Sequence, residues 1–165
     1  MKSSLLLLGT FLCLNCFSQS AAYYIKMGNK KNKFNDYHGA LNDYLKAFRI
    51  NSKDTISLFG IISSKNQIWL KEFNNNDNIM FYLNKYVELN KNKASAYITR
   101  SEIESNRGKT TAAMLDLDIA IGLDNKNATA YYEREILRHN IGDKEGAELD
   151  YKEYRKLTQK DTTEK

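Results

Sequence analysis

The sequence predicts an all-α protein made of about four stacked helix-turn-helix repeats. Two similar stretches, "NDYHGALNDYLKAF" and "GDKEGAELDYKEYR", place their alanines, Ala40 and Ala147, far apart in the chain. Three segments of equal length also align on one frame without gaps. A recurrence with a period of about 34 residues is typical of helical repeats, in which each unit buries its apolar face only by stacking on its neighbours.

The first eighteen residues, 1–18, have the pattern of a secretory signal peptide. Lys2 precedes the apolar run Leu5–Leu14, which is too short to span a bilayer, and small residues follow it. Cleavage is predicted after Ser18, which would remove both cysteines, Cys13 and Cys16, and leave no thiol in the mature chain. The alternative is a lipid anchor at Cys16. Either way we expect an exported protein, periplasmic or secreted.

The three aligned segments are residues 21–54, 94–127 and 128–161, and small or aromatic side chains recur in them. Small residues let two helices approach closely, and aromatic residues fill the space around them. The fourth place is a tyrosine, the twentieth an alanine, and the twenty-fourth large and apolar: Tyr24, Tyr97 and Tyr131; Ala40, Ala113 and Ala147; Tyr44, Leu117 and Tyr151. This pattern predicts a helical hairpin in each segment.

Residues 55–93 are predicted to form a degenerate repeat with a five-residue insertion. The separation of Ala40 and Ala147 equals three regular repeats plus these five inserted residues. Ile79, Leu83 and Tyr86 then fall at places 20, 24 and 27. The first half is apolar at spacings that suit a helix one turn longer than usual, at Leu58, Ile62, Trp69 and Phe73.

The pattern resembles the tetratricopeptide repeat (TPR) family over residues 21–161. Gly28 fits the small eighth place, and Gly108 and Gly142 fit the fifteenth; Ser101 and Glu135 depart from the pattern at place 8, and the usual proline at place 32 is missing. The resemblance implies a right-handed α-solenoid in which each repeat is an antiparallel pair of helices, A and B. Residues 162–165 are expected to be a frayed tail.

The resemblance also implies where a partner would bind. In the family the A helices line a concave groove, mainly with side chains from places 2, 5, 9, 12 and 13. The candidate partner-binding residues are therefore Ile25, Asn29, Asn32, Ile98, Glu102, Tyr132, Ile136 and His139. The last three lie three to four residues apart, on one face of a helix. Of the carboxylate clamp found in chaperone-binding members, only Asn29 matches.

The sequence has no recognisable motif for catalysis or metal binding. His38 and His139 have no cysteine or acidic residue at a metal-ligand spacing. "NRGKTTAA" ends like a phosphate-binding loop, but Ile103 stands where the first glycine is needed, so this stretch is interpreted as a turn between two helices. We expect no enzyme, no cofactor and no metal.

Charge is unevenly distributed along the chain. Residues 21–93 hold 12 basic and 6 acidic side chains, and residues 94–165 hold 12 and 14. The lysines are not interleaved with aromatic residues, so they indicate a solvated face rather than a nucleic-acid site. The expected function is an exported, non-catalytic module that binds a protein, as a peptide or helix, in its groove. The alternative is a structural subunit of a cell-envelope or secretion complex that uses its convex face or its ends. Partner identity and oligomeric state stay open.

Overall fold

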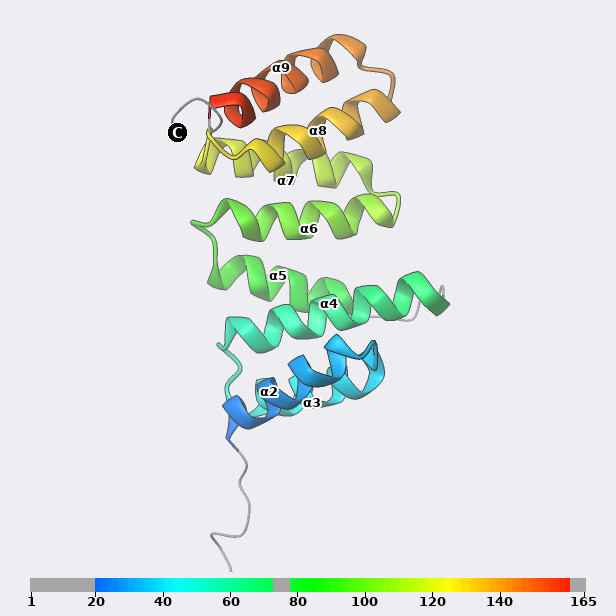
Figure 1. The fold of residues 1–165 in the computed structure, drawn as a ribbon, viewed down its shortest axis with the longest axis vertical. Helices are drawn as coiled ribbons and strands as arrows, with labels where there is room; N and C mark the ends of the chain where they lie inside the picture. The colour runs from blue at the N-terminus through cyan, green and yellow to red at the C-terminus, as the bar shows by residue number, and fades with distance from the viewer. Residues whose placement is uncertain (1–19, 73–77, 161–165) are drawn as a thin grey trace, which may run out of the picture. The chain divides into compact units, whose positions relative to one another are not determined.

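A computed structural model describes residues 20–72 and 78–160 (Figure 1). The predicted signal peptide, the predicted C-terminal tail and Phe73 lie outside these ranges. Within them the regular structure is entirely helical, which confirms the predicted all-α fold of helix-turn-helix repeats. The helices are α2 (Ala21–Lys33), α3 (Tyr37–Ile50), α4 (Thr55–Glu72), α5 (Ile79–Leu89), α6 (Ala94–Asn106), α7 (Thr110–Leu123), α8 (Ala128–Asn140) and α9 (Lys144–Lys160).

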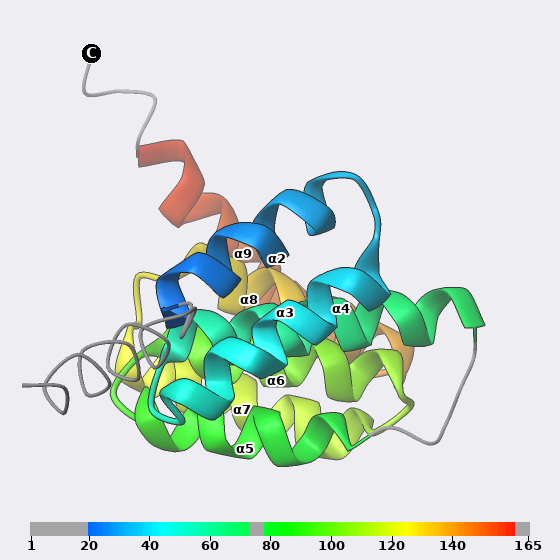
Figure 2. The same cartoon turned by 90° about the horizontal axis from the view of Figure 1, so that it is seen from below.

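The chain divides into two compact units, residues 1–77 and 78–165. In the first unit, α2 and α3 pack against each other as neighbouring helices of a hairpin, and α3 packs on α4 (Figure 2). In the second unit, α6 pairs with α7, α8 pairs with α9, and α7 packs on α8. By their places in the predicted repeats, α2, α4, α6 and α8 correspond to A helices, and α3, α5, α7 and α9 correspond to B helices.

Polar residues at the start of the helices explain why these helices begin where they do. The side chains of Ser20, Asp36, Asn127 and Asp143 each accept a hydrogen bond from the backbone N–H three residues later, at 2.9–3.3 Å. Asp54 does the same for Ser57 at 2.7 Å. These bonds satisfy N–H groups that have no partner within the helix.

The turn between helices A and B needs a left-handed residue at place 15. Gly108 and Gly142 have φ values of 74° and 85°, and Asn35 holds the same place in the first repeat with φ 60°. Glycine adopts this conformation freely, and asparagine tolerates it better than most residues do. The stretch around Gly108 joins α6 to α7, which confirms its interpretation as a turn.

The core of the first unit is built around Tyr44 of α3. Its ring lies against two glycines from two different helices: a Cβ on Gly28 would be 2.8 Å from the ring, and one on Gly60 would be 2.5 Å from it. The Tyr44 hydroxyl donates a hydrogen bond to Oδ1 of Asn29 at 2.7 Å. Burial raises the pKa of this hydroxyl above its ordinary value.

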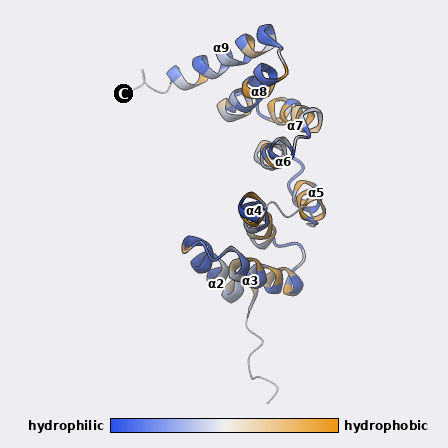
Figure 3. Cartoon of the chain, turned by 90° about the vertical axis from the view of Figure 1, so that its right-hand side faces the viewer, coloured by the Kyte–Doolittle hydropathy of each residue, from blue (hydrophilic) through white to orange (hydrophobic). Residues whose placement is uncertain are grey.

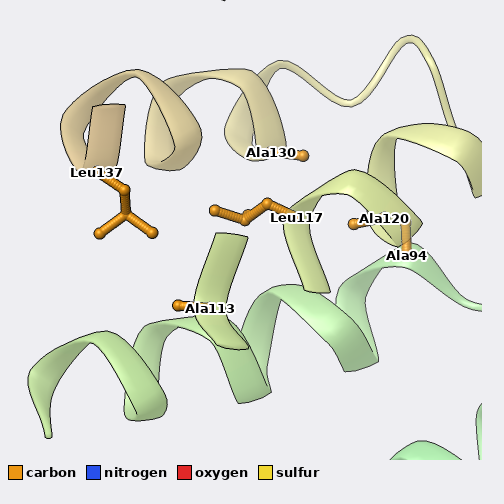
Figure 4. Close-up of a cluster of buried hydrophobic side chains, with 6 residues drawn as sticks. All are labelled: Ala94, Ala113, Leu117, Ala120, Ala130 and Leu137. Atoms are coloured by element: carbon orange, nitrogen blue, oxygen red, sulfur yellow. The ribbon is translucent and has the colours of Figure 1, made fainter. Parts of the chain in front are cut away.

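The core of the second unit is formed by small and branched apolar side chains from α6, α7 and α8 (Figure 4). Leu117 is fully buried in this cluster. Tyr97 and Ile98 of α6 pack against the cluster and stay partly exposed. The other buried members are Ala94, Ala113, Ala120, Ala130 and Leu137. The alanines at place 20 are buried as the repeat pattern predicts.

Residues 55–93, predicted to be a repeat with an insertion, differ from the three regular repeats mainly in α4. This helix has 18 residues, whereas α2, α6 and α8 have 13 each. Its excess of five residues is more than the one turn predicted, because a turn takes about 3.6 residues. α5 starts at Ile79, the place of the alanine, whereas α3 and α7 start three residues before that alanine.

The extended end of α4 contacts the start of α3. Nε2 of His38 lies 2.7 Å from Oε1 of Glu72, and Nζ of Lys71 lies 4.7 Å from the centre of the Tyr37 ring. His38 is exposed, and Glu72 is a partner distant in the sequence that the residue pattern did not predict. The additional turn of α4 is therefore held against the first hairpin by two surface contacts.

None of the described helices combines the length and the apolar character needed to cross a membrane. The colouring by hydropathy in Figure 3 shows α2 and α9 as largely hydrophilic, whereas α7 carries many hydrophobic residues.

Candidate functional site

The predicted binding residues lie on the A helices, at repeat places 2, 5, 9, 12 and 13. We call these positions the A-helix face and describe it separately for each unit. In the first unit, α2 contributes Ile25, Asn29 and Asn32. Ile25 is partly buried, Asn29 is exposed and Asn32 is partly buried.

The two asparagines of α2 direct their amide oxygens into the hairpin. Oδ1 of Asn29 accepts the hydrogen bond of the buried Tyr44 hydroxyl at 2.7 Å, so this amide helps to hold α3 on α2. Oδ1 of Asn32 is buried and has no hydrogen-bond partner among the described residues. Ile25 is therefore the predicted residue of α2 that offers apolar surface.

Two exposed apolar residues of α4 lie on the same face and were not predicted. Ile56 is 59% exposed and Phe59 is 48% exposed, at places 2 and 5 of the second repeat, whereas place 9 is the partly buried Ser63. The signal was available in the sequence, because the insertion lies after these places and does not shift them. All four A helices thus have an apolar residue at place 5: Ile25, Phe59, Ile98 and Tyr132.

The face in the second unit contains the other predicted residues. Ile98 on α6 and Ile136 on α8 are partly buried, and Tyr132 on α8 is 43% exposed. The Tyr132 ring is held by α9, since its centre lies 5.2 Å from that of Tyr154. His139 is exposed on the last turn of α8.

Two glutamates stand on the neighbouring helices α6 and α8: Glu102 at place 9, on this face, and Glu133 at place 6, outside the places that define it. Glu102 is exposed, and Glu133 is partly buried. Burial and, to a lesser extent, the negative charge of Glu102 raise the pKa of the Glu133 carboxyl. The two helices α6 and α8 are in contact.

The arginines of the same helices point into the helical hairpins. Nε and Nη2 of Arg100 donate to the two oxygens of Asp116, both at 2.7 Å, and Nη1 donates to Oδ1 of Asn84 at 3.1 Å. Arg100 therefore ties α6 to its own B helix, α7, and to the preceding B helix, α5. The hydrogen bond from Arg100 to Asp116 raises the pKa of the guanidinium.

The next repeat has the same arrangement. Nε and Nη2 of Arg134 donate to the carboxylate of Asp150 at 2.9 and 2.6 Å, and Nη1 donates to Oδ1 of Asp118 at 2.6 Å. Arg138 adds a second cation to Asp150 at 2.8 Å. We call each set an arginine clamp: an arginine at place 7, an aspartate at place 23, and an acid or amide at place 25 of the preceding repeat.

The clamps were not predicted. Their sequence signal is an aspartate at place 23 of each regular repeat: Asp43, Asp116 and Asp150. In the structure all three aspartates are buried. In the first repeat Asp43 forms an ion pair with Lys31 of α2 instead, with Oδ2 of Asp43 2.7 Å from Nζ of Lys31. Recognising the signal requires knowing that places 7 and 23 face each other, which the repeat alignment alone does not show.

A second exposed feature lies on the B helices of the second unit. Phe81, Leu115 and Leu149 stand at place 22 of α5, α7 and α9, and their exposed fractions are 60%, 61% and 62%. We call these three residues the B-helix row. Such large apolar side chains at one repeated position are a candidate contact surface.

Metal-ligating residues do not gather in the described part of the chain. Among those residues, no three His, Cys, Asp or Glu side chains are grouped so that they could hold a metal ion. His38 contacts Glu72 within the first unit, whereas His139 belongs to the second unit.

Comparison with known proteins supports the fold. No protein-family model matches the chain, and no curated protein matches it. Among solved structures, the crystal structure of MamA protein is similar with a TM-score of 0.73 and 22% identity, over 87% of this chain and 75% of that chain.

Two further structures are TPR domains by their descriptions. The Arabidopsis OM64 TPR domain has a TM-score of 0.62 and 18% identity, over 73% of this chain and 96% of its own. The first TPR of Spaghetti (RPAP3), bound to the HSP90 peptide SRMEEVD, has a TM-score of 0.64 and 23% identity, over 76% of this chain and 96% of that chain. The fold of the chain is therefore that of TPR domains, as the sequence pattern predicted.

Proposed function

We propose that this chain is an exported, non-catalytic interaction module whose A-helix face binds a peptide or helix of a partner protein. The observation that carries the proposal is that, within each unit, both A helices have an apolar residue at place 5. Ile25, Phe59, Ile98 and Tyr132 all keep part of their side chain accessible. Pre-formed surfaces of this kind can take up a segment with little reorganisation.

The structural neighbours support this proposal without naming a partner. The TPR of Spaghetti in that structure holds a peptide, which shows that the fold can do so. That peptide contains two adjacent glutamates. The face in the second unit of the present chain carries the exposed Glu102, so an acidic peptide is not the expected ligand there.

A capture experiment tests the proposal. The chain from residue 19 onward is crosslinked and recovered from the native cell envelope, and the partners are compared between the wild type and the variant Tyr132→Ala/His139→Ala. Both side chains are exposed, so the substitutions should leave the fold intact, which circular dichroism checks. We expect the variant to lose its partners, because Tyr132 is an exposed large apolar side chain of α8.

The B-helix row supports a second candidate, a structural subunit that joins an envelope assembly through its B helices. The matched variant for it is Phe81→Ala/Leu115→Ala/Leu149→Ala. Loss of partners in this variant, with the Tyr132→Ala/His139→Ala variant unaffected, would favour the assembly role and contradict binding on the A-helix face.

Export is proposed on the pattern of residues 1–18, and it has its own test. The protein is recovered from cell fractions, and its N-terminus is determined by mass spectrometry. We expect a chain that begins at Gln19. A mature chain that begins at an acylated Cys16 would show a lipoprotein instead, and a chain that retains Lys2 in the cytoplasm would contradict export.

A further inference from the structure

Helix α7 is apolar on its exposed side as well as on its buried side. Its buried side contributes Leu117 and two alanines to the core of the second unit (Figure 4). Its exposed side carries Leu115, Ile119 and Leu123, which follow one another at intervals of four residues and are 61%, 44% and 43% exposed. We call these three residues the α7 stripe. A helix that is apolar all round is normally covered on every side, so we expect the α7 stripe to be covered too.

The charges of α7 are already neutralised within the second unit. The helix has two charged residues, Asp116 and Asp118. Nη2 of Arg100 donates to Asp116 at 2.7 Å, and Nη1 of Arg134 donates to Asp118 at 2.6 Å. An apolar surface can therefore approach α7 without leaving a carboxylate of this helix unpaired, which would be costly.

The arginine clamps place α7 between the two other B helices of this unit. The guanidinium of Arg100 bonds to side chains of both α5 and α7, and that of Arg134 bonds to side chains of both α7 and α9. Two helices that share one guanidinium lie next to each other. Phe81 and Leu149, the outer members of the B-helix row, therefore extend the α7 stripe on either side. We call the stripe and these two residues together the B-helix surface.

The net charge of the second unit favours a second copy of the chain as the occupant of this surface. Residues 78–165 hold 15 basic and 15 acidic side chains, whereas residues 20–77 hold 9 basic and 5 acidic ones. Two second units therefore do not repel each other through their net charge, while two first units do. In a two-fold contact each surface must also be complementary to itself. An uncharged apolar surface meets this condition, and a surface with one sign of charge does not.

We propose that two copies of this chain associate through their B-helix surfaces, with α7 of one copy against α7 of the other. The contact buries the α7 stripe of both copies, and Phe81 and Leu149 widen it. Five side chains per copy are few beside the roughly 20–30 residues a side of a stable interface, so the dimer is weak, with a Kd of about 10–100 μM. The contact uses a surface other than the A-helix face and does not depend on the proposed function.

Sedimentation equilibrium tests the proposal on the chain from residue 19 onward, at concentrations from about 1 to about 500 μM. We expect the average mass to rise from that of one chain towards that of two. The rise should persist at high salt, because salt does not screen an apolar contact, whereas an association through charges would weaken. Tyr132→Ala/His139→Ala should leave the mass unchanged, since both residues lie on the A-helix face.

Variants at Ile119 distinguish a second copy from a surface that binds any apolar partner. Because Ile119 is the middle residue of the stripe, it meets its counterpart whether the two helices run parallel or antiparallel. Ile119→Glu and Ile119→Lys should each weaken association by about ten-fold or more, since like charges would meet. An equimolar mixture of the two variants should recover it. Circular dichroism checks that each variant is folded.

The matched control is Ile141→Glu. Ile141 is 58% exposed in the same unit, but it follows α8 and lies outside the B-helix surface. This substitution adds the same charge in place of the same side chain, so we expect it to leave the association unchanged. An equal loss of association in Ile141→Glu and Ile119→Glu would show a general charge effect and overturn the proposal.

The remaining outcomes decide the inference separately from the proposed function. A rising mass, with recovery in the mixture, supports it. A chain that stays monomeric over the whole range overturns it. Co-sedimentation with vesicles of phosphatidylethanolamine and phosphatidylglycerol, or envelope capture by the wild type but not by Ile119→Glu, would then show whether a membrane or another protein covers the surface. Association that Tyr132→Ala/His139→Ala abolishes also overturns it, because the contact would lie on the A-helix face.

Discussion

Single residues decide how closely the first two A helices approach α3. The repeat pattern identifies Gly28 as the small residue at place 8, and in the structure it lies against the ring of Tyr44. Gly60 was not identified, because it stands at place 6 of a degenerate repeat. The two glycines leave space for one tyrosine, whose hydroxyl is bonded to Asn29. Large and small side chains thus complement each other across three helices.

A substitution at Gly28 tests this packing. Gly28→Ala places a Cβ 2.8–3.0 Å from three atoms of the Tyr44 ring, so we expect it to lower the free energy of unfolding by about 1–3 kcal/mol. Gly122→Ala in α7 is the control, because nothing lies within 4 Å of its Cβ. That change should stabilise the protein by about 0.5–1 kcal/mol. Urea unfolding measures both, and a stabilising Gly28→Ala would contradict the packing.

Glu104 leads to a prediction about pH. The Glu104 side chain is buried, and its Oε2 has no hydrogen-bond partner among the described residues. Burial and, to a lesser extent, the negative charge of Asp116 raise the pKa of the Glu104 carboxyl. When an acid has a higher pKa in the folded state than in the unfolded state, its contribution to stability is fully present below the unfolded-state pKa. This contribution is lost as the pH rises through the folded-state pKa.

Glu104→Gln should therefore stabilise the protein at neutral pH, by about 1 kcal/mol, because it removes the buried charge. The gain should disappear below pH 4.5, the ordinary value for a glutamate, where the wild-type side chain is also neutral. Urea unfolding of the variant and the wild type, at neutral pH and below pH 4.5, measures this gain in the free energy of unfolding. The exposed Glu102→Gln serves as the control, and an equal gain at both pH values would argue against this explanation.

Helices of the second unit are joined by the arginine clamps. Each clamp uses three nitrogens of one guanidinium to bind two B helices, which a lysine could not do because it is a point charge on a flexible stem. Asp116 is buried and bound by Arg100, with Glu104 as an acidic neighbour, whereas Asp150 has both Arg134 and Arg138. The two clamps should thus differ in their tolerance of mutation.

Arg100→Met should destabilise the protein by about 3 kcal/mol, because it leaves the buried Asp116 without a cation. Arg134→Met should cost less, since Arg138 stays 2.8 Å from Asp150. Thermal unfolding of the two variants measures the difference. The double variant Arg100→Met/Asp116→Leu should recover most of the loss. If Arg134→Met were the more damaging of the two, the sharing of Asp150 would have no energetic role.

At the scale of the chain as a whole, the last helix is polar where the preceding B helix is apolar. At places 21 and 28, α7 has Met114 and Ile121, which pack against the core cluster of the second unit. α9 has Glu148 and Arg155 at these places, both exposed, and Tyr151 at place 24 is 44% exposed. Terminal repeats with a polar outer face keep such arrays soluble.

Replacing these charges should therefore promote self-association. We expect the variant Glu148→Leu/Lys152→Leu/Arg155→Leu to form dimers or larger species at concentrations where the wild type is unchanged, because the new surface resembles the one that α7 offers to α8. Size-exclusion chromatography with light scattering measures the masses. The control Glu88→Leu/Lys91→Leu/Lys93→Leu adds the same apolar residues elsewhere, and equal association by both variants would contradict a special role for α9.

Residue type and spacing were enough to predict the helices, their pairing and the packing places. These features depend on a repeated pattern, and the alanines at place 20, Ala40, Ala113 and Ala147, are buried as expected. The apolar members of the predicted face followed from the groove places that the TPR resemblance implies. Ile56 and Phe59 could have been found in the same way.

The use of the polar groups could be learned only from the folded arrangement of the helices. Asn29 accepts the hydrogen bond of the Tyr44 hydroxyl, the arginines at place 7 bind aspartates of the B helices, and Glu102 stays exposed on the A-helix face. Side chains that are distant in the sequence, such as Arg100 and Asp116, meet only after two helices have folded against each other. The physical reason is that burial acts on a residue through its type and period, whereas an ion pair depends on which side chains from different helices come within about 3 Å.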